Sequence, residues 1–420
     1  GLGGGGYFGN GTTLSIVNCH LADNFATNLD ASAAETESGG GFYMGSPSFA
    51  LLGCTFTNNY TLDDGGAVYS AGAAGTTGIV ADCTFTTNCA LGGTGGTLYT
   101  LGTGGTQFYA LTNCTFLFNW SAGSGGGGCL IDGDYLYMYN CRFTNNVSTT
   151  ANGGGFYAGG TLVAAVMSNC TFVGNQADGS ATTASGGGGM YFADGTNIAV
   201  QGCYFADNLV TNLDGVGGEY EYGGGLRAGS PSLAMQNCTF TNNYALGNGG
   251  GFYSYSLAGT QTHSVSNCTF VANRANASGG GFLVSDGDYM SIYGCGFTNN
   301  TAVTGNGGGF YVGGTFVTMG ITNCGVMGNQ SDGLGGGGYF GNGILLTVEG
   351  CFLANNLATN IDASAAETEQ GGALYVGNPS FTLRNCTFTN NVALDDAGAV
   401  YSAGAAGTTG IVADCTFTTN

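Results

Sequence analysis

Cysteine is the residue type whose spacing most clearly suggests chemistry in this chain of 420 residues. Sixteen cysteines are present, and fourteen of them recur at intervals of 27 to 35 residues. Regularly spaced thiols can form disulfides, bind a metal or pack as free thiols. The chain has no Cys-x-x-Cys pair and no Cys/His cluster, so free thiols or disulfides are favoured over a metal site. The recurring positions are Cys19, Cys54, Cys83, Cys114, Cys141, Cys170, Cys203, Cys238, Cys268, Cys295, Cys324, Cys351, Cys386 and Cys415.

Phenylalanine and asparagine accompany these cysteines at fixed distances. Phe stands two residues after Cys in eleven of the fourteen units, and Asn stands five residues after it in all of them. In Cys-x-Phe, both side chains point to one face of an extended strand. An Asn at the following turn can exchange amide hydrogen bonds with its equivalents in neighbouring units. The asparagines are Asn24, Asn59, Asn88, Asn119, Asn146, Asn175, Asn208, Asn243, Asn273, Asn300, Asn329, Asn356, Asn391 and Asn420.

Two further extended segments complete each unit. One is a Gly-Gly-(Gly/Ala)-apolar element, as at 39–43 and 65–69, and the other precedes the Cys, as in "TLSIVNC". Three short strands in about 30 residues, repeated without helical periodicity, predict one coil of a parallel β-helix. We expect an all-β solenoid of about fourteen coils, continuous over residues 1–420, with a cysteine ladder and an asparagine ladder. The glycines let the chain turn at positive φ and let backbones approach closely.

This geometry bears on the state of the thiols. Equivalent Cα atoms of stacked coils lie about 4.8 Å apart, but parallel Cβ vectors hold the Cβ atoms farther apart than the roughly 3.8 Å that a disulfide prefers. Buried free thiols are therefore favoured, and disulfides between adjacent coils remain the alternative. Cys89 and Cys129 lie off the ladder, and Cys129 takes the place of the aromatic residue after a Gly run, which indicates a core position.

Insertions concentrate at one corner of the coil, between the ladder Asn and the Gly run. The three longest are acidic, and we expect solvated loops on one side of the coil, with Ca²⁺ binding as the alternative, although no EF-hand pattern is present. A longer repeat also exists, because residues 1–88 and 333–420 align at 67 of 88 positions. The carboxylates of the inserts are Asp30, Glu35 and Glu37; Asp214, Glu219 and Glu221; and Asp362, Glu367 and Glu369.

The charge balance excludes several functions. Four arginines and no lysine face 25 acidic residues, which gives a net charge of −21. Nucleic-acid binding needs a basic surface and is therefore excluded. No apolar run approaches the roughly 18 residues that cross a bilayer, so no membrane insertion is expected within this segment.

Catalysis is not expected. A β-helical polysaccharide lyase or hydrolase needs paired carboxylates, or carboxylate-bound calcium, beside a basic residue. The carboxylate pairs recur with the long repeat, which indicates architecture, and we assign no catalytic, cofactor or metal residue. His20 and His263 have no partner in their motifs and are expected at the surface. The four arginines share no ladder position, and the residues considered are Arg142, Arg227, Arg274 and Arg384, with the pairs Asp63–Asp64 and Asp395–Asp396.

Two outward-facing patterns remain. Thr-x-Thr pairs such as Thr55 and Thr57 could bind ice or a crystal surface. Arg142, Tyr204 and Phe352 interrupt the array, however, so the β-propensity of Thr is the preferred explanation. Asn-x-Ser/Thr sequons that precede the inward Cys should face outward and are the candidates for glycosylation in a secretory setting. These are Asn113, Asn169, Asn237, Asn267 and Asn385.

The paired Phe-x-x-Asn and Gly-Gly-Ala-(Ile/Leu/Val) elements resemble the repeats of the polymorphic outer-membrane protein family. The first matches in eleven units, for example Phe56 to Asn59, and the second matches strictly at 65–68 and 371–374. The resemblance implies a right-handed parallel β-helix, as in the adhesin passengers of that family.

We therefore expect an extracellular or cell-surface structural rod: a fibre, a stalk or the shaft of an adhesin, in a longer array or an end-to-end polymer. The expected partners are copies of the chain itself, end to end or side by side, and a surface or carbohydrate ligand; no cofactor is expected. A carbohydrate-active β-helix enzyme is the first alternative, and an ice- or crystal-binding array is the second.

Overall fold

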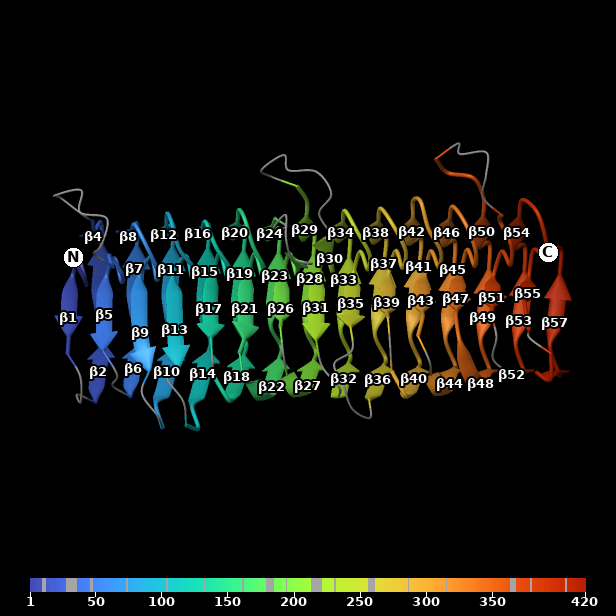
Figure 1. Ribbon diagram of the computed structural model, residues 1–420, viewed down its shortest axis with the longest axis horizontal. Coiled ribbons are helices and arrows are strands. Elements are labelled where there is room, and N and C mark those ends of the chain that lie inside the picture. Colours follow the sequence, from blue (N-terminus) through green and yellow to red (C-terminus); the bar gives the residue numbers. More distant parts are fainter. Residues whose placement is uncertain are drawn as a thin grey trace. The chain divides into compact units, whose positions relative to one another are not determined.

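The computed structural model describes residues 1–9, 13–27, 36–45, 48–72, 75–102, 105–131, 133–160, 162–178, 185–193, 195–212, 221–229, 232–255, 261–285, 287–314, 316–362, 368–377, 380–404 and 406–420. The chain comprises two units. The first is Gly1–Ala199 with Asn208–Glu221, and the second is Val200–Asp207 with Tyr222–Asn420. In each unit the described elements are β-strands that pair in parallel with the equivalent strands of the preceding and following coils (Figure 1).

Four parallel sheets, A to D, line the coils, and sheet A is formed by the strands that follow the Gly runs. Sheet A of the first unit comprises β1 (Gly6–Phe8), β5 (Phe42–Gly45), β9 (Val68–Gly72), β13 (Leu98–Gly102), β17 (Gly128–Ile131), β21 (Phe156–Gly159) and β26 (Met190–Phe192). That of the second unit comprises β31 (Leu226–Gly229), β35 (Phe252–Tyr255), β39 (Phe282–Val284), β43 (Phe310–Val312), β47 (Gly338–Phe340), β51 (Leu374–Val376) and β55 (Val400–Ser402).

Sheet B is formed by the strands that precede each ladder Cys. Its first-unit strands are β2 (Leu14–Val17), β6 (Phe49–Leu52), β10 (Thr77–Ala81), β14 (Phe108–Thr112), β18 (Tyr135–Tyr139) and β22 (Leu162–Ser168), and β27 (Gly195–Gln201) begins in the first unit and ends in the second. Its second-unit strands are β32 (Ser232–Gln236), β36 (Thr262–Ser266), β40 (Tyr289–Tyr293), β44 (Phe316–Thr322), β48 (Gly343–Glu349), β52 (Ser380–Arg384) and β56 (Gly410–Ala413).

Sheet C carries the Cys-x-Phe motif. Its first-unit strands are β3 (His20–Ala22), β7 (Thr55–Thr57), β11 (Thr84–Thr86), β15 (Thr115–Leu117), β19 (Arg142–Thr144) and β23 (Thr171–Val173). Its second-unit strands are β28 (Tyr204–Ala206), β33 (Thr239–Thr241), β37 (Thr269–Val271), β41 (Gly296–Thr298), β45 (Gly325–Met327), β49 (Phe352–Ala354), β53 (Thr387–Thr389) and β57 (Thr416–Thr418).

Sheet D consists of two-residue strands directly after the ladder Asn. They are β4 (Phe25–Ala26), β8 (Tyr60–Thr61), β12 (Cys89–Ala90), β16 (Trp120–Ser121), β20 (Val147–Ser148), β24 (Gln176–Ala177) and β29 (Leu209–Val210) in the first unit. In the second unit they are β34 (Tyr244–Ala245), β38 (Arg274–Ala275), β42 (Thr301–Ala302), β46 (Gln330–Ser331), β50 (Leu357–Ala358) and β54 (Val392–Ala393). The remaining strands are β25 (Ser185–Gly186) and β30 (Glu221–Tyr222).

The parallel β-helix predicted from the sequence is therefore confirmed, but the prediction of three strands per coil was wrong. The fourth strand, in sheet D, has only two residues, which is too short for an alternating pattern to be visible. The prediction that one continuous solenoid covers residues 1–420 stays a prediction.

Three corners of each coil turn through a residue in the left-handed region. The first is the residue before the ladder Cys, such as Asn113 at φ 53°, and the second is the residue before the ladder Asn, such as Asn58 at φ 52°. The third is the first glycine of the Gly run, such as Gly65 at φ 68°. Glycine and asparagine adopt this region at lowest cost. The recurrent Asn-Cys, Asn-Asn and Gly-Gly steps therefore encode the corners.

The second glycine of each run allows the coils to approach closely. A Cβ atom on Gly66 would lie 2.0 Å from the carbonyl oxygen of Gly96 in the next coil, and 2.7 Å from the backbone nitrogen of Cys89. No side chain fits at this position. The sequence-based explanation of the Gly runs is therefore confirmed.

The core is built from stacked equivalents. Phe56, Phe85, Phe116, Phe143 and Phe172 form a column whose successive ring centroids lie 4.9, 4.8, 4.5 and 4.7 Å apart. All five side chains are buried. In the second unit, Phe205, Phe240, Phe270 and Phe297 repeat the column. Each coil therefore stabilises its neighbours through both apolar burial and ring stacking.

Candidate functional surfaces: ladders, inserts and outward faces

The asparagine ladder is continuous within each unit. The Nδ2 group of Asn59 donates to Oδ1 of Asn88 over 2.9 Å and to the carbonyl oxygen of Leu21 over 3.0 Å. The backbone N–H of Asn59 donates to the same Oδ1 over 3.0 Å. These contacts recur from Asn24 to Asn208 and again from Asn243 to Asn420. The predicted amide ladder is confirmed, and its members are almost all fully buried.

The thiols also form a ladder. The Sγ–H of Cys54 lies 3.4 Å from the carbonyl oxygens of Leu52 and Ile16, and the Cys54 backbone N–H donates to Sγ of Cys83 over 3.3 Å. All sixteen cysteines fall within the described residues and carry free thiols. The structure therefore has free thiols, the favoured prediction, and not disulfides between coils.

Burial favours the protonated form of the thiols of Cys54, Cys89 and Cys129. Desolvation raises the pKa of Cys54, and burial raises the pKa of Cys89 to about 11. Cys129 is 1% exposed, as predicted for a core position, and desolvation followed by the nearby Asp64 carboxylate raises its pKa well above the ordinary value. A protonated thiol is a poor nucleophile and a poor metal ligand. These three thiols are therefore suited to packing and not to reaction.

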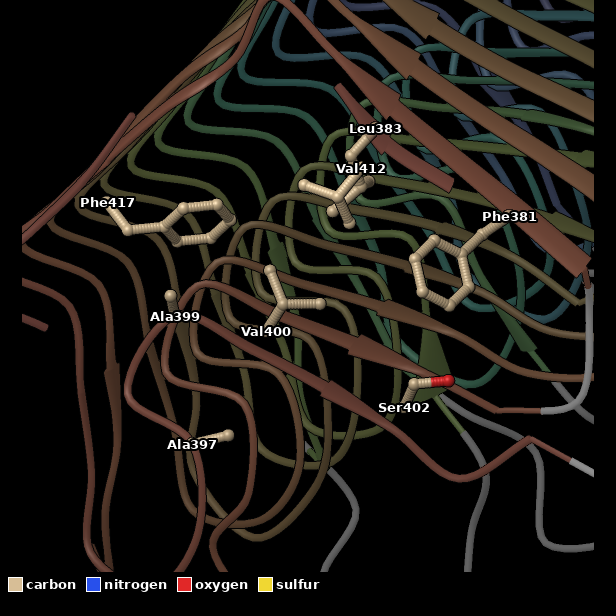
Figure 2. A pocket seen from close by; sticks show the side chains of 8 residues that line it. All are labelled: Phe381, Leu383, Ala397, Ala399, Val400, Ser402, Val412 and Phe417. Carbon is tan, nitrogen blue, oxygen red and sulfur yellow. The ribbon is translucent and has the colours of Figure 1, made fainter. Parts of the chain in front are cut away.

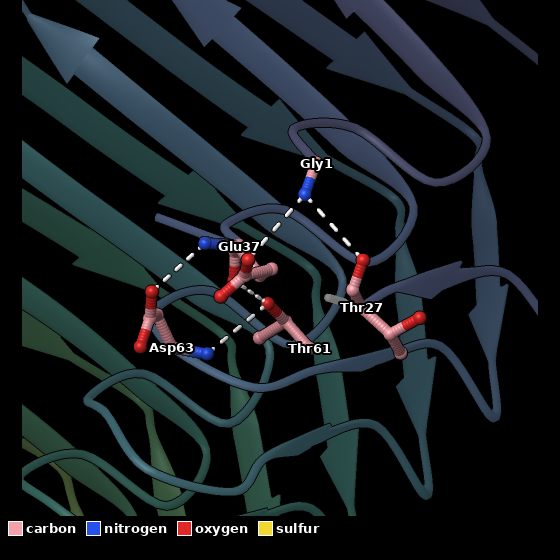
Figure 3. A network of polar contacts seen from close by, with 5 residues as sticks. All are labelled: Gly1, Thr27, Glu37, Thr61 and Asp63. Carbon is pink, nitrogen blue, oxygen red and sulfur yellow. Dashed lines mark hydrogen bonds and ion pairs between the residues drawn. The ribbon is translucent and has the colours of Figure 1, made fainter. Parts of the chain in front are cut away.

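The acidic inserts depart from the expectation that their carboxylates are solvated. Glu37, Glu221 and Glu369 are 4%, 0% and 3% exposed. The backbone N–H of Glu37 donates to Oδ2 of Asp63 over 2.8 Å, and the Asp63 N–H donates to the Glu37 carbonyl oxygen over 3.0 Å (Figure 3). For these three residues the prediction of solvated carboxylates was wrong. At Glu37 the end of the insert is hydrogen-bonded to the next coil, and the side chain is buried there.

The long repeat reproduces this attachment in the second unit. The Glu369 N–H donates to Oδ2 of Asp395, and the Asp395 N–H donates to the Glu369 carbonyl oxygen, both over 3.1 Å. The start of this insert is also held, since the N–H groups of Ile361 and Asp362 donate to Oδ1 of the buried Asp332. The acidic pairs therefore serve architecture. Asp30, Glu35, Asp214, Glu219 and Glu367 lie outside the described residues.

The charge on this corner affects Glu369. Burial, and then the neighbouring Asp395 carboxylate, raise the pKa of Glu369 above the ordinary carboxyl value. Among the described residues, no group of three His, Cys, Asp or Glu side chains is arranged to hold a metal ion. Calcium binding by the inserts stays a prediction.

The basic residues do not converge. Arg142, Arg227, Arg274 and Arg384 belong to sheets C, A, D and B respectively, so no two share a ladder position. Arg227 is 4% exposed and lies over the rings of Tyr222, Tyr253 and Tyr255, with centroid distances of 5.5, 5.7 and 4.9 Å. This cation–π environment explains a buried guanidinium in a sheet A position that other coils give to an aromatic residue.

The two histidines lie in different environments. His20 is exposed, as predicted. His263 is 1% exposed, so its predicted surface position was wrong. It pairs with Leu233 and Met290 in the neighbouring strands of sheet B, and alternation along β36 turns all three side chains inward.

The sequons separate as predicted into buried and exposed classes. Asn59, Asn119, Asn146 and Asn329 are fully buried in the amide ladder. Asn113, Asn169, Asn237, Asn267 and Asn385 are exposed at left-handed corners. Glycosylation at these five stays a prediction.

An apolar cavity of about 350 Å³ lies among the last described coils of the second unit (Figure 2). Its walls include the buried Leu383, the half-buried Phe381 and the exposed Phe417, and Ser402 is its polar member. A cavity without ionisable groups offers no acid, base or nucleophile.

Comparison with known proteins agrees with the coil geometry. A model of right-handed β-helix regions matches residues 98–297. A model of the Chlamydia polymorphic membrane protein repeat matches residues 53–71 and 385–403, which contain Phe56 to Asn59 and Phe388 to Asn391. The chain is therefore a right-handed β-helix protein, and some of its coils are similar to the polymorphic membrane protein repeat. No curated protein and no solved structure matches it. Among the described residues, no helix is long and apolar enough to cross a membrane.

The polymorphic membrane protein-like coils also carry an outward tyrosine column that sequence reasoning missed. Tyr7, Tyr43, Tyr69 and Tyr99 pair in register on sheet A, with ring centroids 5.1, 4.9 and 5.2 Å apart. Tyr311, Tyr339, Tyr375 and Tyr401 form a second column in the other unit. Burial raises the pKa of Tyr69 to about 12. The signal was present in "GGGFY" and "GGAVY", where the Tyr follows the inward apolar residue.

The outward face of sheet B differs most from coil to coil. Strand β18 of this polymorphic membrane protein-like chain projects Tyr135, Tyr137 and Tyr139, each 39% exposed. Strand β40 projects Tyr289 at 45% and Tyr293 at 50%. The alternation in "YLYMYNC" was used only to predict a strand, so these side chains were also missed.

Proposed function

We propose that this chain is the shaft of a cell-surface or secreted β-helical adhesin or stalk, with a structural and adhesive role and no catalytic one. The single observation that carries the proposal is the extent of the ladders. Inward Asn, Cys and Phe positions repeat in coil after coil within each unit, so the described interior serves stacking. The polymorphic membrane protein repeat supports a surface location.

The arrangement of charged residues supports a role without catalysis. The arginines lie on four different sheets, and the acidic pairs at Asp63 and Asp395 bind backbone N–H groups of the inserts. A lyase or hydrolase would need such groups to converge around one substrate bond. Release of reducing ends or unsaturated sugars from a polysaccharide panel would contradict this part of the proposal.

Copies of the chain are the partners that the proposal favours. Coil stacking requires only another coil that presents the same rungs, so the contact that joins coils within a unit can also join two chains end to end. Size-exclusion chromatography with light scattering at several concentrations tests this contact.

A length variant tests the shaft. Residues 89–208 contain four complete repeats, and a second copy of this segment inserted after Asn208 adds four coils. Because parallel strands of successive coils lie about 4.8 Å apart, the longest dimension should grow by about 19 Å. Small-angle X-ray scattering measures this increase, and immunogold labelling of intact source cells tests the location. An unchanged longest dimension, or label confined to the cell interior, would refute the shaft.

A further inference from the structure

The two strands of sheet B that project tyrosines outward share a construction that other sheet B strands lack. Each follows a Gly-Asp step, Gly133-Asp134 before Tyr135 and Gly287-Asp288 before Tyr289. Both strands project tyrosines at the first and fifth positions, and the intervening side chains, such as Met138 and Ile292, are buried. We call these surfaces the first platform (Tyr135, Tyr137 and Tyr139) and the second platform (Tyr289 and Tyr293).

The aspartate anchors each platform to the coils on both sides. Oδ2 of Asp134 accepts the backbone N–H of Gln107 over 2.6 Å, and the Asp134 carbonyl oxygen accepts N–H groups from Val163 and Ala164 over 2.8 and 3.0 Å. These bonds fix the backbone at the start of β18. They also engage Oδ2 of the Asp134 carboxylate.

The second platform repeats this anchor bond for bond. Oδ2 of Asp288 accepts the N–H of Gln261 over 2.7 Å. Its carbonyl oxygen accepts N–H groups from Val317 and Thr318 over 2.8 and 3.1 Å. Rings held on a rigid strand lose little conformational freedom when a ligand covers them.

Uncharged residues flank the rings, and all of them except Phe108, which pairs with Tyr135, are small. Tyr137 pairs with Ala110 on one side and Val166 on the other, and Tyr139 pairs with Thr112 and Ser168. Around the second platform, the neighbours of Tyr289 are Thr262 and Thr318, and those of Tyr293 are Ser266 and Thr322. Most of these neighbouring side chains are shorter than the tyrosines and end in methyl or hydroxyl groups. No charged side chain lies among these paired neighbours.

We propose that both platforms bind neutral polysaccharide chains by stacking sugar rings on the exposed tyrosines. Sugar rings present apolar C–H faces bordered by hydroxyl groups, which suit aromatic rings and Ser/Thr hydroxyls. First and fifth residues of a strand lie about 13 Å apart, so the ligand must be extended and cover several sugar units. This proposal rests on the adhesive role proposed above and names its ligand class.

Charge favours a neutral polysaccharide over other occupants. The chain carries a net charge of −21, so an anionic membrane and an acidic polysaccharide are both repelled. A membrane-binding face would carry Lys or Arg to attract anionic lipids, and neither platform has one among its paired neighbours. A neutral polysaccharide is not repelled by the negative charge of the chain.

Affinity electrophoresis of the full chain tests the proposal. The acidic protein migrates in native gels that contain hydroxyethylcellulose, galactomannan or laminarin, with alginate as the acidic comparison. We expect retardation in at least one neutral gel and none in alginate. Y289A/Y293A and Y135A/Y137A/Y139A should each weaken retardation. The variant that combines all five substitutions should raise the apparent dissociation constant about tenfold or more.

A matched variant controls for loss of any exposed ring. Y204A/F352A removes two outward rings of sheet C that are 41% and 43% exposed, and it should leave retardation unchanged. Circular dichroism confirms that each variant is folded. The proposal is overturned if no neutral gel retards the wild type, or if the control weakens retardation equally. A change in oligomeric state without a change in retardation would assign the platforms to self-association. The shaft is judged by scattering and labelling, so its failure is distinguishable from this one.

Discussion

Replacing Asn119 with alanine should remove one rung of the amide ladder. Its Nδ2 group donates to Oδ1 of Asn146 over 2.9 Å and to the carbonyl oxygen of Phe85 over 3.1 Å. Its Oδ1 accepts from the backbone N–H and from Nδ2 of Asn88, over 2.9 and 3.1 Å. The backbone N–H of residue 119 still donates to Oδ1 of Asn146 in the variant, because that bond does not use the side chain of Asn119.

The cost follows from the groups left without a partner. Asn88 is fully buried and loses the acceptor for two of its donors. A buried donor without a partner costs about 1–3 kcal/mol, so two cost about 2–6 kcal/mol. Asn119→Asp retains the shape but provides no donor and buries a charge, so it should destabilise at least as much at neutral pH.

Asn113→Gly is the matched control in the same coil. Asn113 is exposed at φ 53°, and its Nδ2 donates to Oδ1 of Asp82 over 3.0 Å. Glycine tolerates this backbone conformation, and other coils carry it there, as at Gly53. The control should therefore change the free energy of unfolding by less than about 0.5 kcal/mol.

Urea unfolding followed by circular dichroism gives the free-energy differences, and hydrogen exchange of the peptide that contains Asn88 locates the damage. Asn119→Ala should speed exchange at Asn88 far more than at distant coils, since solenoids are stabilised by nearest neighbours. If Asn119→Ala and Asn113→Gly have equal stability, the amide ladder does not stabilise the fold and the reasoning fails.

Three further predictions concern the other rungs. Iodoacetamide at pH 8 should modify the exposed Cys19 first and leave the buried ladder thiols unmodified, and all sixteen thiols should react after denaturation without reductant. Disulfides found by mass spectrometry would contradict the thiol ladder. Gly66→Ala should destabilise by about 3 kcal/mol in thermal or urea unfolding, whereas Gly251→Ala should cost less, because Ala67 and Ala373 occupy that position in other coils. Glu369→Gln should raise the melting temperature at pH 7 to 8, because the raised native pKa of Glu369 means that stability falls as the pH rises through that pKa. The gain should vanish below about pH 4, where Glu369 is protonated in both the folded and the unfolded chain, and a gain that does not depend on pH would have another cause.

The coil itself could be predicted because its signals recur. A single Cys-x-Phe pair is weak evidence for a strand, but the same spacing to the next Asn in fourteen units leaves little room for another fold. The left-handed corners were visible for the same reason, since Asn-Cys and Gly-Gly occur at fixed places. Because the motif recurs so often, the units in which Leu21 or Val326 replaces Phe did not obscure it.

The misses came from features that a periodic pattern does not record. The strands of sheet D are two residues long, so they show no alternation. Glu369 was assigned to a solvated loop from its charge, but its burial depends on Asp395 in the next coil, 26 residues away. His263 was placed by its residue type and not by its register with Leu233 and Met290. Each error is a contact between coils that composition alone cannot supply.

The difference between inward and outward positions indicates which side chains can recognise a ligand in a β-helix. Inward columns must repeat, because each side chain packs on its own equivalent, as the Phe column shows at 4.5 to 5.0 Å. A column that must repeat cannot distinguish one ligand from another. Outward positions of sheet B face no such demand: the column through Ala110, Tyr137 and Val166 changes size and chemistry at every step. Specificity should therefore follow substitutions in this column, and stability should follow those in the ladders.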